Sequence, residues 1–423
     1  MAPPDAARQG PSWMGKMRIR AAMGLLGNLA SQAPGTYGFD ALRHAREFDV
    51  SLEDIRRNRL ASETDRGHRA IQSINWFLPH PGHLFGGLQT PLRFASYFKQ
   101  AKAVRNRFIL MSAAPKRRLE KTLVEAFPAL QGDEVLTFSR PDDLPGIDEA
   151  DAAIATYWKT AYPLAKFQGK DRKFYFIQDF EPLFYPAGSS SAQAEATYRF
   201  GFFGIASTPH LQEIYRDSYA GRAASFMPCV DTEVFHPLQN RITGKLTVFF
   251  YGRPSIARNG FELGAEALRR LKARLGDRVR IVTAGAAWRP QEYGLAGVVE
   301  NLGVVDRKTW ASLCRSADVG LITIFTPVHS YVHLDLMASG CLVVSNDNPG
   351  TRWLLEDGRN CLLFPAATPG CIAETLLRAL EDRPERERMV SNALDTIRRS
   401  HSSWDKAGEK IYSFMCDPLG FTT

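Results

Sequence analysis

The hydrophobic residues of this chain form short continuous runs that alternate with amphipathic, helix-like segments. In the first half these runs lie at 70–79, 107–114, 134–139, 151–158, 173–180, 203–209 and 224–230. In the second half they lie at 245–252, 279–285, 299–305, 318–325, 341–347 and 360–365. Apolar strands separated by helices are typical of parallel sheets covered on both faces. The two halves therefore predict an α/β protein with two doubly wound, Rossmann-like domains.

A polar stretch containing proline and glycine, residues 231–244, separates the two halves. We predict an N-terminal extension at 1–65, either disordered or lying on a membrane surface, and a first domain at 66–235. A second domain should occupy 236–402, and a final helix within 403–423 should dock back onto the first domain. Ligands of parallel sheets bind beyond the carboxyl ends of the strands, so the cleft between the domains is the expected site.

Composition limits the class of protein. The chain has 423 residues, of which 44% are hydrophobic and 23% are charged, as in folded soluble proteins. No apolar run reaches the length of a membrane-spanning helix, and no secretory signal is evident. The six cysteines form no CxxC pair, which favours a reducing cytoplasm and argues against a zinc site.

The net charge of +8 indicates acidic partners. Nine lysines and arginines lie between Arg93 and Lys121, against the single acid Glu120. This cluster fits a solvated face, or an anionic membrane that would hold the protein at the inner face of the plasma membrane. Nucleic acid is a weaker third alternative, because aromatic residues are not interleaved with the basic ones.

The segment "YGRPSIARNGFEL", residues 251–263, follows a predicted strand and precedes a predicted helix. Gly252 allows a turn at the strand end, and Arg253 and Arg258 bring two guanidinium groups close to a helix start. Both features favour a bound phosphate or diphosphate. The alternative is a surface loop with two solvated arginines.

A second glycine-containing turn lies in the first domain. Gly86 and Gly87 stand between a strand and a helix that we expect to begin near Thr90, where backbone N–H groups are open to a ligand oxygen. A simple tight turn is the alternative. His80 and His83 lie in the same loop, but they lack further ligand-spaced partners, so we expect no metal.

Carboxylate side chains are predicted at the head of one helix and at the end of one strand. Asp335 is predicted at the head of a helix that buries Leu334, where it would accept hydrogen bonds from ribose hydroxyls or complement the helix dipole. Asp179 and Glu181 should lie on the same side of a strand end, since alternate residues share a face. Such a pair suits Mg²⁺, acid–base chemistry or sugar hydroxyls, and Tyr185 adds a ring for a sugar or for the core.

Together, "YGRPSIARNG" at 251–260 and "HLDLMASGCLVVSND" at 333–347 resemble the retaining GT-B glycosyltransferases, a large family that includes glycogen synthase-like enzymes. The stretch 175–202 is similar to a subgroup of rhamnosyltransferases of bacterial surface polysaccharides and S-layer glycans, which use dTDP-rhamnose. The similarity extends from about residue 70 to the end. It implies two domains facing one another across a cleft, and a nucleotide-diphosphate sugar as co-substrate with no other cofactor.

The resemblance also implies roles for individual residues. The arginines and Asp179 would be catalytic. The residues expected to bind the donor are Gly86, Gly87, Arg253, Arg258, Gly285, Ser330, Tyr331, Leu334 and Asp335. Those expected to contact the acceptor or the sugar are Gln178, Asp179, Glu181, Tyr185 and His83.

Three positions depart from the family pattern, and the first is Asp335, where the family usually has a glutamate. A second glutamate, often present eight positions before the acid at Asp335, is replaced by Pro327. A common His-Asp pair is replaced by Gln178 and Asp179. Because that histidine lies near the sugar O6 in relatives, a glutamine is compatible with a 6-deoxy donor.

The sequence thus predicts an enzyme that moves a sugar, rhamnose or another deoxysugar, onto a glycan or lipid-linked saccharide. Two alternatives remain open. One is a nucleotide-sugar epimerase or hydrolase of the same fold, and the other is a non-catalytic module that binds a nucleotide or nucleic acid.

Overall fold

The computed structural model describes residues 42–80, 86–112, 114, 116–139, 144, 146–238 and 244–422. His83 and the first 41 residues, including most of the predicted extension, lie outside the described residues. The compact unit Val50–Thr423 contains two parallel sheets. No described helix is long and apolar enough to cross a membrane.

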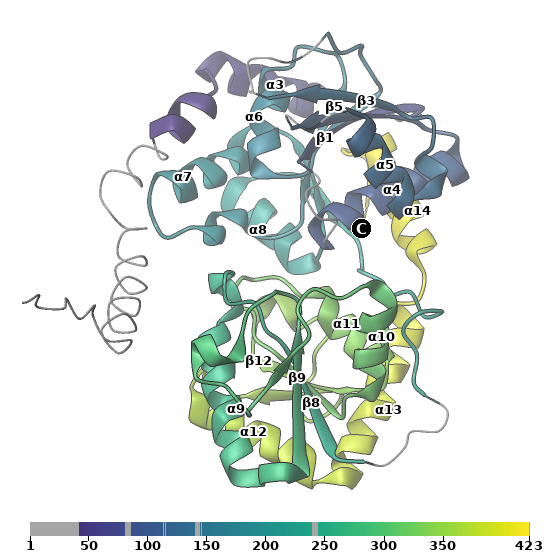
Figure 1. The fold of residues 1–423 in the computed structure, drawn as a ribbon. Helices are drawn as coiled ribbons and strands as arrows, with labels where there is room; N and C mark the ends of the chain where they lie inside the picture. Colours follow the sequence, from purple (N-terminus) through teal and green to yellow (C-terminus); the bar gives the residue numbers. More distant parts are fainter. Residues whose placement is uncertain are drawn as a thin grey trace, which may run out of the picture. The chain divides into compact units, whose positions relative to one another are not determined.

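The first sheet has seven parallel strands in the order β3-β2-β1-β4-β5-β6-β7 (Figure 1). Its strands are β1 (Ser73–Pro79), β2 (Arg105–Met111), β3 (Glu134–Phe138), β4 (Ala152–Ala155), β5 (Arg172–Ile177), β6 (Phe203–Ala206) and β7 (Ala223–Ser225). Each overlaps one of the apolar runs of the first half. The chain starts at the middle of the sheet and reverses direction there, as in a doubly wound fold.

The second sheet has six parallel strands in the order β10-β9-β8-β11-β12-β13. Its strands are β8 (Leu246–Tyr251), β9 (Val279–Ala284), β10 (Glu300–Asn301), β11 (Val319–Ile322), β12 (Leu342–Asn346) and β13 (Leu362–Phe364). Each overlaps one of the apolar runs of the second half. The predicted α/β class with two Rossmann-like domains is therefore confirmed.

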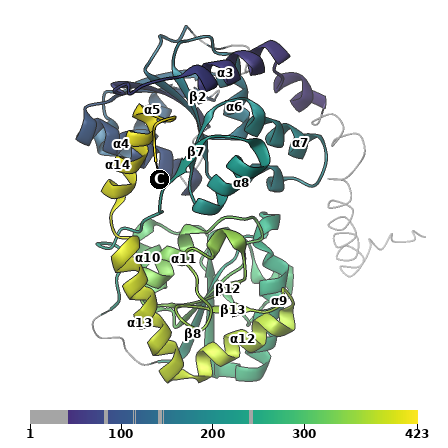
Figure 2. The same cartoon turned by 180° about the vertical axis from the view of Figure 1, so that it is seen from behind.

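Helices cover both faces of the first sheet (Figures 1 and 2). They are α4 (Gly86–Lys102), α5 (Lys116–Ala126) and α14 (Trp404–Cys416) on one face, and α6 (Trp158–Lys166), α7 (Ser189–Ala196) and α8 (Pro209–Tyr219) on the other. The ring of Phe94 from α4 contacts the rings of Phe176, Phe226 and Trp404. The C-terminal helix thus packs into the core of the first sheet, where Ile411 and Phe414 are buried.

The second sheet is covered in the same way. Its helices are α9 (Phe261–Leu275) and α12 (Pro369–Glu381) on one face, and α10 (Arg307–Ser316), α11 (Tyr331–Ala338) and α13 (Arg383–Ser400) on the other. Successive residues of β8 show why the middle of this strand is apolar. Val248 and Phe250 pack into the cluster with α9 and α12, whereas Phe249 packs into the cluster with α10 and α11.

Short 3₁₀ helices connect these elements. They are η1 (Pro128–Leu130), η2 (Glu181–Phe184), η3 (Thr197–Arg199), η4 (Ala257–Asn259), η5 (Gly276–Arg278), η6 (Pro290–Tyr293) and η7 (Pro349–Thr351). Two of them, η2 of the first domain and η4 of the second domain, contact each other.

Helix α3 (Leu52–Thr64) lies within the stretch predicted as an extension. Just after it, Asp65 accepts a hydrogen bond from Arg172 of β5 at 2.8 Å, and this arginine side chain is 3% exposed. Asn58 donates to the carbonyl of Ala165 at the end of α6. Residues 52–65 are therefore an integral part of the first domain, which corrects the predicted boundary. The alternation of strands and helices could not predict this boundary, because it does not show whether a single helix before the first strand belongs to the domain.

Candidate functional site

The loop after β8 in the second domain carries the two arginines. Gly252 is required there because a Cβ atom at this position would lie 2.3 Å from Oγ1 of Thr283. Arg253 donates from Nη1 to the hydroxyl of Tyr251 at 3.1 Å. The chain then forms η4 and enters α9 through Gly260, whose φ of +50° favours glycine. The loop therefore holds Arg253 against the end of its own strand.

Arg258 reaches the first domain. Its Nε lies 3.6 Å from Oδ2 of Asp179, and its guanidinium carbon lies 4.2 Å from the centre of the Phe184 ring. The hydroxyl of Thr326, in the loop after β11, donates to the same carboxylate oxygen at 3.2 Å. Asp179 thus contacts two groups of the second domain, Arg258 through an ion pair and Thr326 through a hydrogen bond.

Asp179 follows β5 and is 7% exposed. Burial raises its pKa to about 6, although Arg258 and the hydrogen bonds to the carboxylate act in the opposite direction. Such a carboxyl changes charge close to neutral pH, as a group that exchanges protons or partners during a reaction requires.

The glycine turn adjoins this contact. Helix α4 begins at Gly86 rather than near Thr90, so both glycines lie in its first turn and their N–H groups belong to a helix N-terminus. A Cβ atom on Gly87 would lie 3.4 Å from Oε1 of Gln178, whose Nε2 donates to the carbonyl of Thr156. Gly87, Gln178, Asp179 and Arg258 therefore form a continuous series of neighbours.

Glu181 does not accompany Asp179. It begins η2, and its Oε2 accepts hydrogen bonds from the Trp158 N–H at 2.6 Å and from the Tyr175 hydroxyl at 2.9 Å. The two acids have different hydrogen-bond partners, because β5 ends at Ile177 and the chain enters η2 at Glu181. The Glu181 carboxyl is satisfied inside the first domain.

Tyr185 belongs to the same internal network. Its hydroxyl accepts from Nε1 of Trp158 at 3.1 Å and lies 3.1 Å from the hydroxyl of Tyr157. Of the predicted acceptor or sugar contacts, Gln178 and Asp179 therefore lie beside the second domain or the glycine turn, whereas Glu181 and Tyr185 surround Trp158.

We expect the free energy of unfolding to depend on pH through Glu181. Burial raises the pKa of this carboxyl to about 8, so between about pH 4.5 and 8 the unfolded chain is ionised while the folded chain keeps the proton. Stability must then fall as pH rises through this window. Glu181→Gln keeps an acceptor for Trp158 and Tyr175 but cannot ionise.

Urea unfolding at pH 5 and pH 8 measures this effect. The stability of Glu181→Gln relative to the parent should improve by more than ~1 kcal/mol between these pH values, since a tenfold change in proton affinity corresponds to about 1.4 kcal/mol. The exposed Glu125→Gln is the matched control and should show no such trend. Parallel curves for Glu181→Gln and its parent would contradict the assignment.

Helix α11 presents the other predicted donor residues. Ser330 caps it by accepting from the Val332 N–H, and the hydroxyl of Tyr331 lies 2.7 Å from that of Thr90 in α4. The Leu334 side chain is fully buried in the core, so only its backbone is available to a ligand. Tyr331 is thus a second contact between the domains.

Asp335 is the fifth residue of α11 rather than its head, because the helix starts at Tyr331. Its Oδ2 accepts from Nε1 of Trp310 at 2.9 Å, and burial raises its pKa to about 7. The Trp310 ring also packs edge-on against the ring of Tyr251, which holds Arg253. Trp310 therefore links the acid to the arginine loop.

Gly285 adjoins the same group. A Cβ atom there would lie 2.6 Å from the Tyr251 ring and 3.4 Å from Cγ of Arg253, and its φ is +117°. Sequence reasoning missed Trp310 and Thr326, because a tryptophan in an amphipathic helix indicates core packing and a lone threonine in a loop carries no signal. Within the described ranges, no three His, Cys, Asp or Glu side chains gather as metal ligands.

The chain matches two models of one protein family. A family model for the N-terminal domain of WsaF matches residues 73–206, and one for the C-terminal domain of WsaF matches residues 246–377. Together these matches span more than half of the chain.

Two sequence relatives illustrate the similarity. The O-antigen biosynthesis protein RfbC of Myxococcus xanthus is 37% identical over 376 residues, which cover 88% of this chain. A phosphatidyl-myo-inositol mannosyltransferase of Mycolicibacterium smegmatis is 35% identical over 163 residues, or 36% of this chain. The chain spans only 29% and 41% of the lengths of these relatives.

Solved structures show the same fold at low identity. HepE of Anabaena, crystallised with UDP-glucose, superposes with a TM-score of 0.64 at 18% identity and covers 81% of this chain and 98% of its own. Sucrose-phosphate synthase of Thermosynechococcus elongatus gives 0.61 at 15% identity, covering 80% and 97%. With both WsaF domain matches the chain belongs to the WsaF family, and its two parallel-sheet domains have the GT-B fold of these solved structures.

Proposed function

We propose that this chain is a retaining glycosyltransferase of bacterial surface glycan assembly. It transfers a sugar, rhamnose or another deoxysugar, from a nucleotide diphosphate to a glycan or lipid-linked saccharide. The name of the Myxococcus relative, an O-antigen biosynthesis protein, supports the glycan acceptor. The complex of HepE with UDP-glucose supports a nucleotide-sugar donor.

One observation carries the proposal. Arg258 extends from the second domain to Asp179 in the first, and Asp179 adjoins Gln178 and thereby the helix start at Gly87. A guanidinium group and free helix N–H groups are the two protein features that best accept a diphosphate. Their convergence from two domains is what a bridging pyrophosphate needs.

The reaction follows from this arrangement. As the bond from the sugar to the diphosphate breaks, negative charge develops on the leaving phosphate, and Arg253 and Arg258 stabilise it there. The acceptor hydroxyl attacks on the same face of an oxocarbenium-like sugar, and its proton passes to the leaving phosphate. Asp179, beside Arg258, orients the acceptor or the sugar.

The proposal of a deoxysugar donor is based on Gln178. Its amide nitrogen is engaged with Thr156, which leaves Oε1 on the side of Gly87. In the retaining GT-B glycosyltransferases that this chain resembles, a histidine commonly occupies this position, near the O6 hydroxyl of the sugar. A donor without that hydroxyl, such as dTDP-rhamnose, fits the exchange.

A panel of nucleotide sugars tests the proposal. A donor at about a hundred times its dissociation constant should stabilise the protein by roughly 2.7 kcal/mol, which raises the midpoint of thermal unfolding. NMR of the product formed with an added glycan should show the donor's anomeric configuration retained. Donor cleavage that yields only free sugar in the presence of glycans would indicate a hydrolase instead.

We expect Gly87→Ala to separate stability from donor binding. Alanine is the better helix former, and its methyl group would make only an ordinary contact with Gln178 at 3.4 Å, so the unfolding midpoint should rise or stay constant. The methyl group would nevertheless obstruct the backbone approach to the diphosphate, raising KM for the donor by about tenfold. Unfolding scans and donor titrations on the same preparation measure both effects. An unchanged KM would exclude Gly87 from the donor site.

We also propose that α5 lies on an anionic membrane that presents the acceptor. Leu123 buries one side of this helix, while Arg117, Arg118 and Lys121 are exposed on the other side and Lys116 is exposed at the first position of the helix. Basic residues at such a surface contribute about 1 kcal/mol each.

Reversing both central charges, Arg117→Glu with Arg118→Glu, should therefore weaken binding to phosphatidylglycerol vesicles by at least ~30-fold. The matched pair Arg269→Glu with Arg270→Glu, on the exposed side of α9, should leave vesicle binding unchanged. Equal losses in the two pairs would contradict a specific role for α5.

A further inference from the structure

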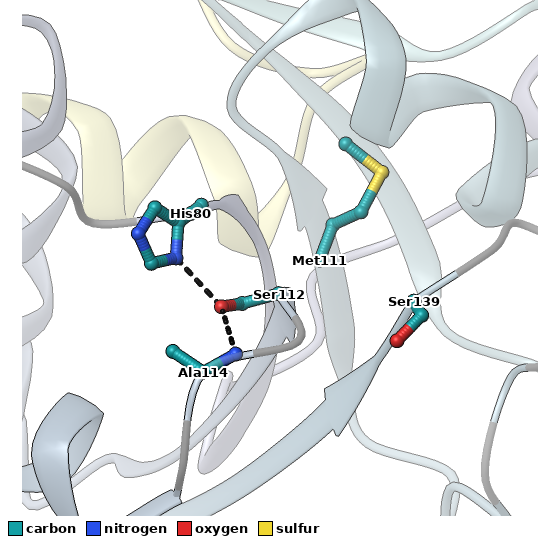
Figure 3. A pocket seen from close by; sticks show the side chains of 5 residues that line it. All are labelled: His80, Met111, Ser112, Ala114 and Ser139. Carbon is teal, nitrogen blue, oxygen red and sulfur yellow. Dashed lines mark hydrogen bonds between the residues drawn. The ribbon is translucent and has the colours of Figure 1, made fainter.

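A pocket of about 360 Å³ opens at the carboxyl edge of the first sheet (Figure 3). His80 directly follows β1, Met111 ends β2, and Ser139 directly follows β3. Ser112 and Ala114 complete the described lining. The pocket therefore lies where parallel sheets bind ligands.

A short hydrogen-bonded chain fixes one wall of the pocket. The buried Ser112 hydroxyl oxygen accepts from the Ala114 N–H at 3.0 Å and lies 2.6 Å from Nδ1 of His80 (Figure 3). The imidazole is thereby held in one orientation although His80 is exposed. The exposed Ser139 contributes a second hydroxyl, and Met111 contributes an apolar side chain.

This lining suits an uncharged sugar ring. A pyranose carries hydroxyls at its edge and an apolar face of C–H groups, which match hydrogen-bonding side chains next to a thioether. The described lining residues contribute hydroxyl, imidazole and thioether groups, and no Lys, Arg, Asp or Glu is among them. The volume lies at the lower end of the range for small-ligand sites.

The position in the sheet separates this pocket from Asp179. Asp179 follows β5, and in the strand order two spacings separate β5 from β1, three separate it from β2 and four separate it from β3. At ~4.8 Å per spacing, the pocket extends from about 10 to about 19 Å from the end of β5. A sugar bound there is too far away to receive the transferred group.

We propose that this pocket is an outlying acceptor subsite, which binds a sugar of an oligosaccharide acceptor one or more residues away from the point of transfer. The inference rests on the proposed function and deepens it. It makes the enzyme selective for an extended, uncharged saccharide, with His80 and Ser139 as the specificity-determining side chains.

Direct binding tests the subsite without any turnover. The probes are the methyl glycosides of rhamnose, mannose and glucose and of their linear trisaccharides, observed by saturation-transfer NMR. At least one trisaccharide should bind, and Ser139→Trp, which fills the pocket from an exposed position, should abolish its signal. Ser218→Trp, on the exposed side of α8, is the matched control and should keep it. Absence of binding by every trisaccharide, or persistence of the signal in Ser139→Trp, would overturn the inference.

Kinetics separates the subsite from the proposed function. The parent should use the bound trisaccharide with a kcat/KM at least about tenfold above that of the monosaccharide, and His80→Ala should remove most of this advantage, as expected for one or two lost hydrogen bonds. Nucleotide-sugar binding and transfer to the monosaccharide should stay unchanged. Equal losses on both acceptors would contradict an outlying subsite. Failure of the parent to bind any nucleotide sugar would instead count against the proposed function.

Discussion

Arg253→Ala is expected to lower kcat/KM for the nucleotide-sugar donor by about a hundredfold or more. Removing one preorganised charge that stabilises a developing oxyanion typically has an effect of this size. The side chain is held by the Tyr251 hydroxyl, and Trp310 packs behind that ring, so its position is set before the donor arrives. Initial-rate kinetics with saturating acceptor measures the loss.

Two controls accompany this variant. Arg253→Lys keeps the charge but not the planar fork, and should recover only part of the activity. Arg269→Ala removes an exposed arginine on α9 that forms an ion pair with Glu266, one helical turn away, and should retain full activity. Near-normal rates for Arg253→Ala would remove this arginine from the diphosphate site.

Arg258→Ala should reduce turnover to a similar extent, with a second consequence in the first domain. It leaves the buried Asp179 carboxyl without its cation, so the pKa of Asp179 should rise above its present value of about 6. Asp179→Asn keeps an oxygen for the Thr326 hydroxyl and should cause a smaller loss.

The double variant Arg258→Ala with Asp179→Asn distinguishes a coupled pair from two independent groups. If Asp179 and Arg258 act together, the loss in the double variant is smaller than the product of the single losses, because each single change already removes their interaction. Multiplicative losses would show that the ion pair across the domains has no part in catalysis. Arg258→Lys tests whether charge alone is sufficient.

The apolar runs predicted both sheets because the central strands are covered on two faces. In β8, Val248, Phe249 and Phe250 are buried on alternate sides of the sheet, so three apolar residues follow one another without a polar position. The arginine loop was predictable for a similar reason, since a glycine and two arginines directly after a buried strand combine backbone access with charge. Gly87 was likewise predictable as part of a turn, although not as part of the first turn of α4.

The roles of individual carboxylates were not predictable in this way. Asp179 and Glu181 are two positions apart, yet one lies against Arg258 and the other is engaged with Trp158 and Tyr175. The separation depends on where β5 ends and η2 begins, which single-sequence patterns define only to within a few residues. The partner of Asp335, Trp310, lies 25 positions earlier in the chain on another helix.

The sequence by itself determined the fold class, the order of the elements and the loops that carry glycines and arginines, because these depend on local hydrophobicity and backbone freedom. Only the tertiary structure decided which side chains meet: Arg258 with Asp179, Tyr331 with Thr90, and His80 with Ser112. These contacts join positions that are 79, 241 and 32 residues apart. Their geometry is set by the packing of whole sheets and helices, and no local pattern encodes it.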